Sequence, residues 1–223
     1  MSIQTNSLDL AVWPQSASRN EAGEIAIAGI PVSELAAQYG TPLFVLDEAD
    51  VRTRAKAYHD AFNSGDVVTD VFYAGKAFMA TKVVKWIVDE GLNVDVCTAG
   101  ELEVALRAGV APERILFHGN NKSISELERA VAVGVGRIIL DSFIEIERLA
   151  NIASAHGVTV QVLIRLTVGV EAHTHDYIST AHEDQKFGLS IATGAALEAA
   201  RLVIESDSLS LLGLHSHIGS QIF

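Results

Sequence analysis

The fold is decided by residues 92–101, which read LNVDVCTAGE. Residues 92–96 are rich in apolar, β-prone side chains, which predicts a buried strand. Directly after them, Thr98-x-x-Glu101 matches a capping box, in which a hydroxyl and a carboxylate bind the free N–H groups of a helix start. The stretch therefore predicts a strand followed at once by a helix, the βα unit from which parallel sheets are built.

The same signature recurs along the chain. Ser123-x-x-Glu126 and Ser142-x-x-Glu145 each closely follow an apolar strand. The hydrophobic pattern predicts strands at 70–76, 92–96, 114–118, 137–141, 160–166 and 211–217, with helices at about 78–90, 99–109, 124–134, 143–156 and 192–205. Residues 42–46, PLFVL, are also expected to form a strand, after a short amphipathic stretch at 31–39.

Alternating strands and helices predict a parallel sheet, either doubly wound or closed into a barrel. No G-x-G-x-x-G follows a strand, so the dinucleotide-binding open sheet has no support. Chemically active side chains instead lie at or just past the C-terminal ends of successive strands: Lys76, Asp95, His118, Asp141, Arg165, His215 and His217. In a barrel these ends meet at one mouth, although strand ends can also be polar only because loops are solvated.

We therefore expect an α/β protein with a (β/α)8 TIM-type barrel. About six of its eight strands would lie in this chain, because a full barrel takes about 250 residues. Residues 1–40 are expected to be a separate N-terminal segment, and residues 41–223 the incomplete barrel.

Composition limits the function. The chain is 49% hydrophobic with a net charge of −12, which suits a globular protein with a large core and argues against binding nucleic acid or an anionic membrane. No signal peptide or membrane span is recognisable, so we expect a cytoplasmic protein with a small-molecule partner. Cys97 is the single cysteine, which excludes an internal disulfide and suggests no thiolate zinc site.

Lys76 lies near the end of the apolar run 70–77, DVFYAGKA. Burial disfavours the charged form of an amine, and a neutral lysine is a nucleophile that forms Schiff bases with carbonyl compounds. The small neighbours Ala74, Gly75 and Ala77 leave room for a bulky group. Alternatively, the side chain leaves the strand and extends into solvent.

Histidines form two further candidate sites. In 213–221, GLHSHIGSQ, an imidazole could stack on an aromatic ligand or transfer protons, Gly219 would allow close backbone approach, and Ser220 could bind an anionic oxygen. Alternation along a strand places His215 and His217 on one side, so they could also bind a metal. The loop 170–188 holds His173, His175 and His182 among acidic residues, which suggests either a metal site or a solvated loop, with 184–189 docking back onto the barrel mouth.

Six segments in this order resemble the fold-type III pyridoxal phosphate decarboxylases: 73–77, 94–101, 117–123, 141–142, 186–188 and 215–221. The resemblance covers roughly residues 25–223. Within the family, 213–221 is most similar to the branch that acts on diaminopimelate rather than the ornithine or arginine branch.

The resemblance implies the cofactor pyridoxal 5'-phosphate and no metal. Lys76 would hold it covalently, His217 would stack on its ring, and Asp95 would lie near Lys76. Arg165 would lie beneath the ring, with Gly219 and Ser220 on the phosphate side. The implied reaction is decarboxylation of meso-2,6-diaminopimelate to L-lysine, catalysed by a homodimer when full length.

The family's glycine-rich phosphate loop, its Glu-Pro-Gly-Arg segment and its C-terminal β domain have no match in these 223 residues. The resemblance thus implies an N-terminal part, inactive alone, whose residues 1–40 would pack with the missing β domain. Three alternatives stay open: an ornithine- or arginine-type decarboxylase or racemase, a non-catalytic barrel without cofactor, and a metal-dependent barrel enzyme using His173, His175 and His217.

Overall fold

A computed structural model describes residues 8–9, 11–168 and 187–217. The chain divides into two compact units. The first runs to Val71 and includes Asp89–Leu92, and the second comprises Phe72–Val88 and continues from Asn93. Among the described residues, no helix is both long and apolar enough to cross a membrane.

The first unit begins with a small antiparallel sheet in the order β1-β2-β3. Its elements are β1 (Ser18–Arg19), β2 (Ile25–Ile27), β3 (Ile30–Pro31), α1 (Val32–Tyr39) and α2 (Glu48–Phe62). The Asp47 carboxylate caps α2 by accepting hydrogen bonds from the N–H groups of Ala49 and Asp50. The strand expected at 42–46 is wrong: the segment pairs with no strand among the described residues, and Phe44 is 98% exposed.

The second unit contains the predicted βα series. Its strands are β4 (Phe72–Ala74), β5 (Asn93–Val96), β6 (Ile115–Phe117), β7 (Arg137–Leu140), β8 (Val160–Thr167), β9 (Leu189–Ser190) and β10 (Leu209–Ser216). Its helices are α3 (Thr81–Asp89), α4 (Ala99–Arg107), α5 (Ile124–Val133), α6 (Phe143–His156) and α7 (Ala195–Ile204), with 3-10 turns η1 (Gly75–Ala77) and η2 (Pro112–Arg114). The six predicted strands and five predicted helices are thus confirmed, with shifts of a few residues at their ends.

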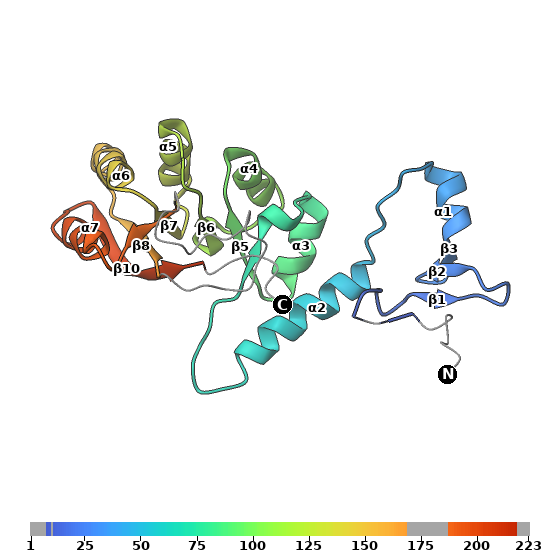
Figure 1. Cartoon of the computed structure of the whole chain (residues 1–223). Coiled ribbons are helices and arrows are strands. Elements are labelled where there is room, and N and C mark those ends of the chain that lie inside the picture. The colour runs from blue at the N-terminus through green and yellow to red at the C-terminus, as the bar shows by residue number, and fades with distance from the viewer. Residues whose placement is uncertain (1–7, 10, 169–186, 218–223) are drawn as a thin grey trace. The chain divides into compact units, whose positions relative to one another are not determined.

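The sheet order identifies the architecture. The strands lie in the order β10-β8-β7-β6-β5-β4, with β9 pairing beside β8, and every pair is parallel. A doubly wound sheet reverses direction at a switch point, whereas this order follows the chain without reversal. In Figure 1, helices α3 to α7 form an arc outside the strands. The second unit is therefore an incomplete TIM-type barrel, as predicted.

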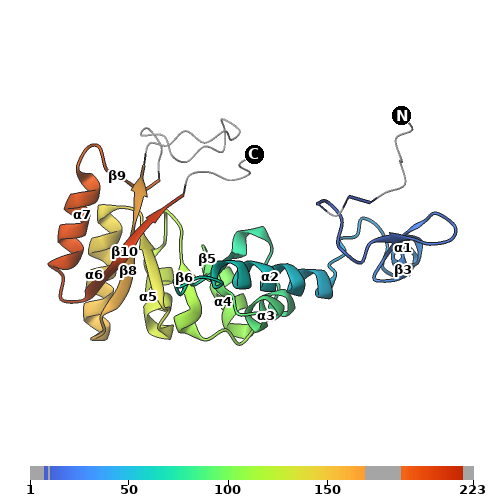
Figure 2. The ribbon, with the colours of Figure 1, turned by 90° about the horizontal axis from the view of Figure 1, so that it is seen from below.

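A continuous apolar core lies between the strands and the helices. Val94, Val96, Phe117 and Ile138 from the sheet are fully buried, as is Leu102 from α4. Figure 2 shows α5, α6 and α7 running alongside the long strands β8 and β10. Because side chains alternate along a strand, burying Val94 and Val96 against the helices directs Asp95 to the opposite side of the sheet.

The three predicted capping boxes differ in detail. The hydroxyls of Thr98, Ser123 and Ser142 accept a backbone hydrogen bond at each helix start, as predicted, but only Ser123 and Glu126 form the complete box. Glu101 and Glu145 reach one residue further back. They accept from the backbone N–H groups of Cys97, at 2.6 Å, and Asp141, at 2.8 Å. These two carboxylates therefore fix the chain where it leaves a strand, next to the site described below.

Candidate active site

A cavity of about 440 Å³ opens at the C-terminal ends of the parallel strands. Four predicted site residues line it, together with two further histidines: Lys76, Asp95, Arg165 and His217, with His118 and His215. The register explains this gathering, because Ala74 pairs with Asp95 across β4 and β5, and Arg165 pairs with His215 across β8 and β10. The prediction that polar strand ends meet at one mouth is thus confirmed for these residues.

Lys76 lies in the turn η1, where the chain leaves β4. The preceding Gly75 is buried, and a Cβ there would approach the Asp95 carbonyl oxygen to 2.7 Å, so the turn requires glycine. Lys76 itself is exposed rather than buried. The expected buried amine is therefore wrong, because β4 ends at Ala74 and the turn carries the lysine to the rim of the cavity.

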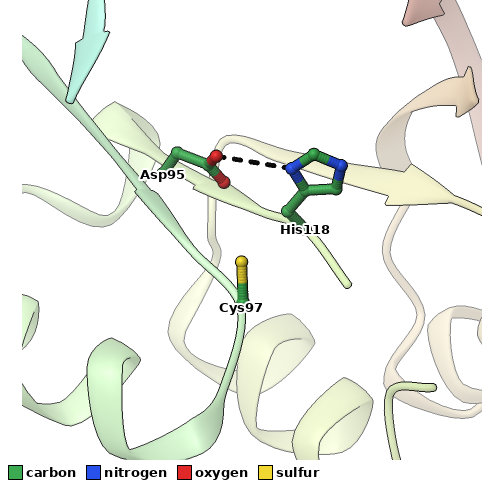
Figure 3. Close-up of side chains that lie close together, drawn as sticks. All are labelled: Asp95, Cys97 and His118. Carbon is green, nitrogen blue, oxygen red and sulfur yellow. Dashed lines mark hydrogen bonds and ion pairs between the residues drawn. The ribbon is translucent and has the colours of Figure 1, made fainter. Parts of the chain in front are cut away.

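Asp95, His118 and Arg165 form a connected polar chain. His118 Nδ1 lies 3.3 Å from Asp95 Oδ2, as Figure 3 shows. Its other nitrogen, Nε2, lies 3.4 Å from Arg165 Nη1. The second Asp95 oxygen, Oδ1, is buried with no hydrogen-bond partner within the described part of the chain. Such an unpaired acceptor is costly unless a group entering the cavity binds it.

Arg165 is held from several sides. Its side chain is 7% exposed, and Nη1 lies 3.3 Å from the buried carboxylate of Asp141. Asp141 also accepts a 2.7 Å hydrogen bond from Gly188 N–H, and the guanidinium lies 4.6 Å from the centre of the Phe187 ring. Burial lowers the pKa of Arg165, and Asp141 opposes that shift, so the guanidinium stays charged.

The expected docking of 184–189 is supported for Phe187 and Gly188; residues 184–186 lie outside the described residues.

His215 and His217 are in their neutral forms near pH 7. Burial is the largest of the causes that lower the pKa of His215 to about 3, and the guanidinium charge of Arg165 adds to it. Burial and then Lys76 lower the pKa of His217. The rings of His118 and His215 meet edge to face, with centres 4.6 Å apart. A neutral imidazole offers a flat face for stacking without repelling the nearby cations.

Cys97 joins Asp95 and His118 in a cluster whose ligand-type atoms lie within 4.8 Å of one another (Figure 3). A thiol must lose its proton to bind a metal. Burial, with Asp95 and Glu101, raises the pKa of Cys97 to about 11, and the His118 nitrogens already face Asp95 and Arg165. This chemistry favours a polar hydrogen-bonded cluster over a metal site.

A buried ion pair holds a loop that lines the cavity. Lys122 Nζ lies 2.9 Å from Glu145 Oε1, and the two side chains are 0% and 6% exposed. Lys122 also donates to the carbonyl oxygens of Gly119 and Ile139, each at 2.7 Å. Since Glu145 binds the Asp141 N–H, this pair fixes both the loop after β6 and the end of β7.

Several predicted residues lie outside the described part of the chain. They are Gly219 and Ser220 of the expected phosphate side, and His173, His175 and His182 of the alternative metal site. Sequence reasoning placed His118 at the barrel mouth but gave it no role, and it missed the pair formed by Lys122 and Glu145. The only signal for His118 was its position directly after a strand.

The described residues fit pyridoxal phosphate. The cavity offers an amine for an aldehyde, imidazole faces for an aromatic ring, and a guanidinium near its base. The buried Asp95 Oδ1 and His215 Nδ1 lack hydrogen-bond partners among the described residues, so both are available to a polar ligand.

Comparison with known proteins agrees with a pyridoxal phosphate site. A family model described as the pyridoxal binding domain of pyridoxal-dependent decarboxylases matches residues 48–223. The chain therefore belongs to the pyridoxal-dependent decarboxylase family, as its motifs predicted.

Particular relatives point to one branch. The chain is 60% identical over 212 residues to diaminopimelate decarboxylase of Mycobacterium tuberculosis, covering 95% of this chain and 47% of that protein. It is 48% identical over 220 residues to diaminopimelate decarboxylase of Corynebacterium efficiens, covering 99% and 47%. Diaminopimelate decarboxylase from M. jannaschii in complex with L-lysine has a similar structure, with a TM-score of 0.85 and 30% identity over 94% of this chain and 49% of that one. The chain thus spans about half the length of the relatives it matches.

Proposed function

We propose that the full-length protein removes one carboxylate of meso-2,6-diaminopimelate and yields L-lysine and CO2, using pyridoxal phosphate. The observation that carries this is the cavity, which Lys76 lines together with three histidines and Asp95, whose buried Oδ1 has no hydrogen-bond partner among the described residues. The substrate follows from the name shared by the relatives and from the lysine bound in the M. jannaschii structure.

Lys76 is the residue that would hold the cofactor covalently. Among the described residues it is the lysine that lines the cavity, and its exposure leaves the amine free to meet an aldehyde. When bound, the cofactor withdraws the electrons released by breaking the bond to the carboxylate. Lys76 also lies where an amine can receive or return the proton exchanged with the substrate.

The other side chains bind and orient. His217, kept neutral by burial, would offer its flat face to the ring. Asp95 Oδ1 would accept a hydrogen bond from a protonated nitrogen in the cavity and so stabilise positive charge there. Arg165, fixed by Asp141 and Phe187, would maintain a positive charge at the base of the cavity. Gly219 and Ser220 would contribute to the phosphate side.

Three further expectations belong to this proposal. The full-length enzyme would be a homodimer in the cytoplasm, consistent with the absence of a membrane-spanning helix among the described residues. Residues 1–40 would pack with a C-terminal β domain of the full-length protein. The partner would be a small-molecule amino-acid substrate, and not nucleic acid, in keeping with the net charge of −12.

Reductive labelling tests the site. Full-length protein is incubated with pyridoxal phosphate, reduced with borohydride, digested and analysed by mass spectrometry. We expect the pyridoxyl group on Lys76, and its loss in Lys76→Arg. Lys56→Arg, at a lysine exposed on α2, is the control and should retain the label. A label elsewhere in wild type, or none, would refute the assignment.

Substrate choice is tested separately by CO2 release from meso-diaminopimelate, ornithine and arginine. We expect the highest kcat/KM with meso-diaminopimelate. A preference for ornithine or arginine would retain the cofactor site but overturn the proposed substrate. An unlabelled, inactive protein would instead support the non-catalytic barrel.

A further inference from the structure

His118 occupies a fixed place between two strands. It directly follows β6, and its backbone N–H donates a 2.7 Å hydrogen bond to the carbonyl oxygen of Val96 in the neighbouring strand β5. The side chain is 13% exposed, and its ring meets the His215 ring edge to face. The backbone and this ring contact together define where the two imidazole nitrogens point.

The neighbours of His118 also define where its proton lies. Arg165 Nη1, 3.4 Å from Nε2, can only donate a hydrogen bond, because a guanidinium has no acceptor. Nε2 must therefore carry a lone pair, and the ring proton must sit on Nδ1. From there it is directed at Asp95 Oδ2, 3.3 Å away. His118 is thus a neutral Nδ1–H tautomer that accepts from Arg165 and donates to Asp95.

This bonding gives the two oxygens of Asp95 different roles. Oδ2 is occupied by His118, whereas Oδ1 is buried and has no hydrogen-bond partner among the described residues. Without His118 the carboxylate could rotate about its last bond or turn toward the guanidinium. With it, one oxygen is anchored and the other remains available to a donor in the cavity.

We propose that His118 is a positioning residue of the cofactor site. Its hydrogen bonds to Asp95 and Arg165 hold the Asp95 carboxylate in one orientation, in which Oδ1 can accept a hydrogen bond from the group that enters the cavity. This inference rests on the proposed pyridoxal phosphate function. His118 also lines the cavity, but in this role it acts through Asp95.

Two substitutions separate positioning from simple packing. His118→Asn places an amide N–H near the position of Nδ1 and so keeps a donor for Asp95, whereas His118→Leu offers none. In the full-length protein we expect His118→Leu to bind pyridoxal phosphate at least about tenfold more weakly, the loss of one charge-assisted hydrogen bond. His118→Asn should restore most of that affinity. Equal affinities of the Leu and Asn variants would overturn the proposal.

A double-mutant cycle shows whether the effect passes through Asp95. In an Asp95→Ala background, His118→Leu should weaken cofactor binding by less than about threefold, because the anchored group is gone. An unchanged tenfold loss in that background would mean that His118 acts independently of Asp95, which contradicts the proposal.

The tautomer is measured without reference to function. In ¹⁵N-histidine-labelled full-length protein, the signal lost in His118→Asn belongs to His118. We expect its Nδ1 to be protonated and its Nε2 to be unprotonated; the reverse tautomer would overturn the proposal even if His118→Leu failed to fold. Wild-type protein that binds no pyridoxal phosphate would refute the proposed function, whereas normal binding with the wrong tautomer refutes only the role of His118.

Discussion

His215 makes the stability of the protein depend on pH. Its pKa is about 3 in the folded protein, against 6.5 for a free histidine, because burial opposes the charged form. Between these values the unfolded chain binds a proton at His215 that the folded chain does not bind. The free energy of unfolding contributed by this residue is therefore fully present above pH 6.5 and is lost progressively as the pH falls toward 3.

We expect His215→Phe, which keeps a ring beside His118 but cannot take up a proton, to lose stability less steeply on acidification. Urea unfolding of both proteins across this range gives the slope of unfolding free energy against pH. We expect the slope to be smaller in His215→Phe, by an amount that corresponds to at most about one bound proton. The two proteins are first compared above pH 6.5, where both side chains are neutral, to isolate packing effects. Identical slopes would show that His215 is not buried in its neutral form.

Individual site residues could be predicted to the extent that they follow strands. Lys76, Asp95, Arg165 and His217 were found because parallel strands bring their ends together. The role of His118 could not be predicted, since it depends on Arg165, which lies 47 residues away in sequence. The exposure of Lys76 was also hidden, because apolar neighbours do not reveal that the strand ends two residues earlier.

At the scale of elements, the buried pair of Lys122 and Glu145 joins the loop after β6 to the start of α6. Removing one partner leaves an uncompensated charge in the interior. We expect Lys122→Met to reduce the free energy of unfolding by about 3 kcal/mol. The measurement is chemical denaturation of full-length protein.

An exposed pair provides the matched control. Arg129 and Glu103 lie 2.8 Å apart with side chains 48% and 39% exposed, so Arg129→Met should cost less than about 1 kcal/mol. The double substitution Lys122→Met with Glu145→Gln should be less harmful than Lys122→Met alone, since no charge is left unpaired. If Lys122→Met were as mild as Arg129→Met, the interior pair would contribute nothing.

The βα series was predictable because strand and helix periodicities alternate along it, and a cap signal agrees with them at α4, α5 and α6. The first unit lacked that agreement. Helix α2 buries only Ala55, so it carries no apolar stripe that sequence analysis could detect. Residues 42–46 mislead in the other direction, because they are apolar and β-prone but form no strand. A strand also needs a ladder partner, which composition does not reveal.

For the whole molecule, the strands at the two ends of the main path of the described sheet have one neighbour each: β4 pairs with β5, and β10 pairs with β8. Strand β10 also exposes Leu212, at 50%, and Leu214, at 60%. Unpaired strand edges with exposed apolar side chains promote association. We expect the isolated 223-residue chain to self-associate, to bind pyridoxal phosphate weakly and to show no decarboxylation.

Sedimentation velocity tests the association. Leu212→Lys combined with Leu214→Lys should shift the isolated chain toward monomer, because the charges oppose edge pairing. Leu197→Lys, at a leucine 58% exposed on α7, adds a charge away from the edge and should have a smaller effect. If Leu197→Lys shifted the chain toward monomer as much as the β10 substitutions do, the effect would come from added charge in general and not from the strand edge.

The unreversed strand order also bears on how the protein is made. Along the main path of the sheet, from β4 to β10, each strand after β4 pairs with a strand that comes earlier in the chain. During translation, every strand that leaves the ribosome therefore meets a partner that has already emerged, together with the helix between them. Contacts between segments that are close in sequence also form faster than contacts between distant segments. The lysine turn after β4 would thus be among the first parts of the cavity in place, and His215 and His217, at the end of β10 and just after it, among the last.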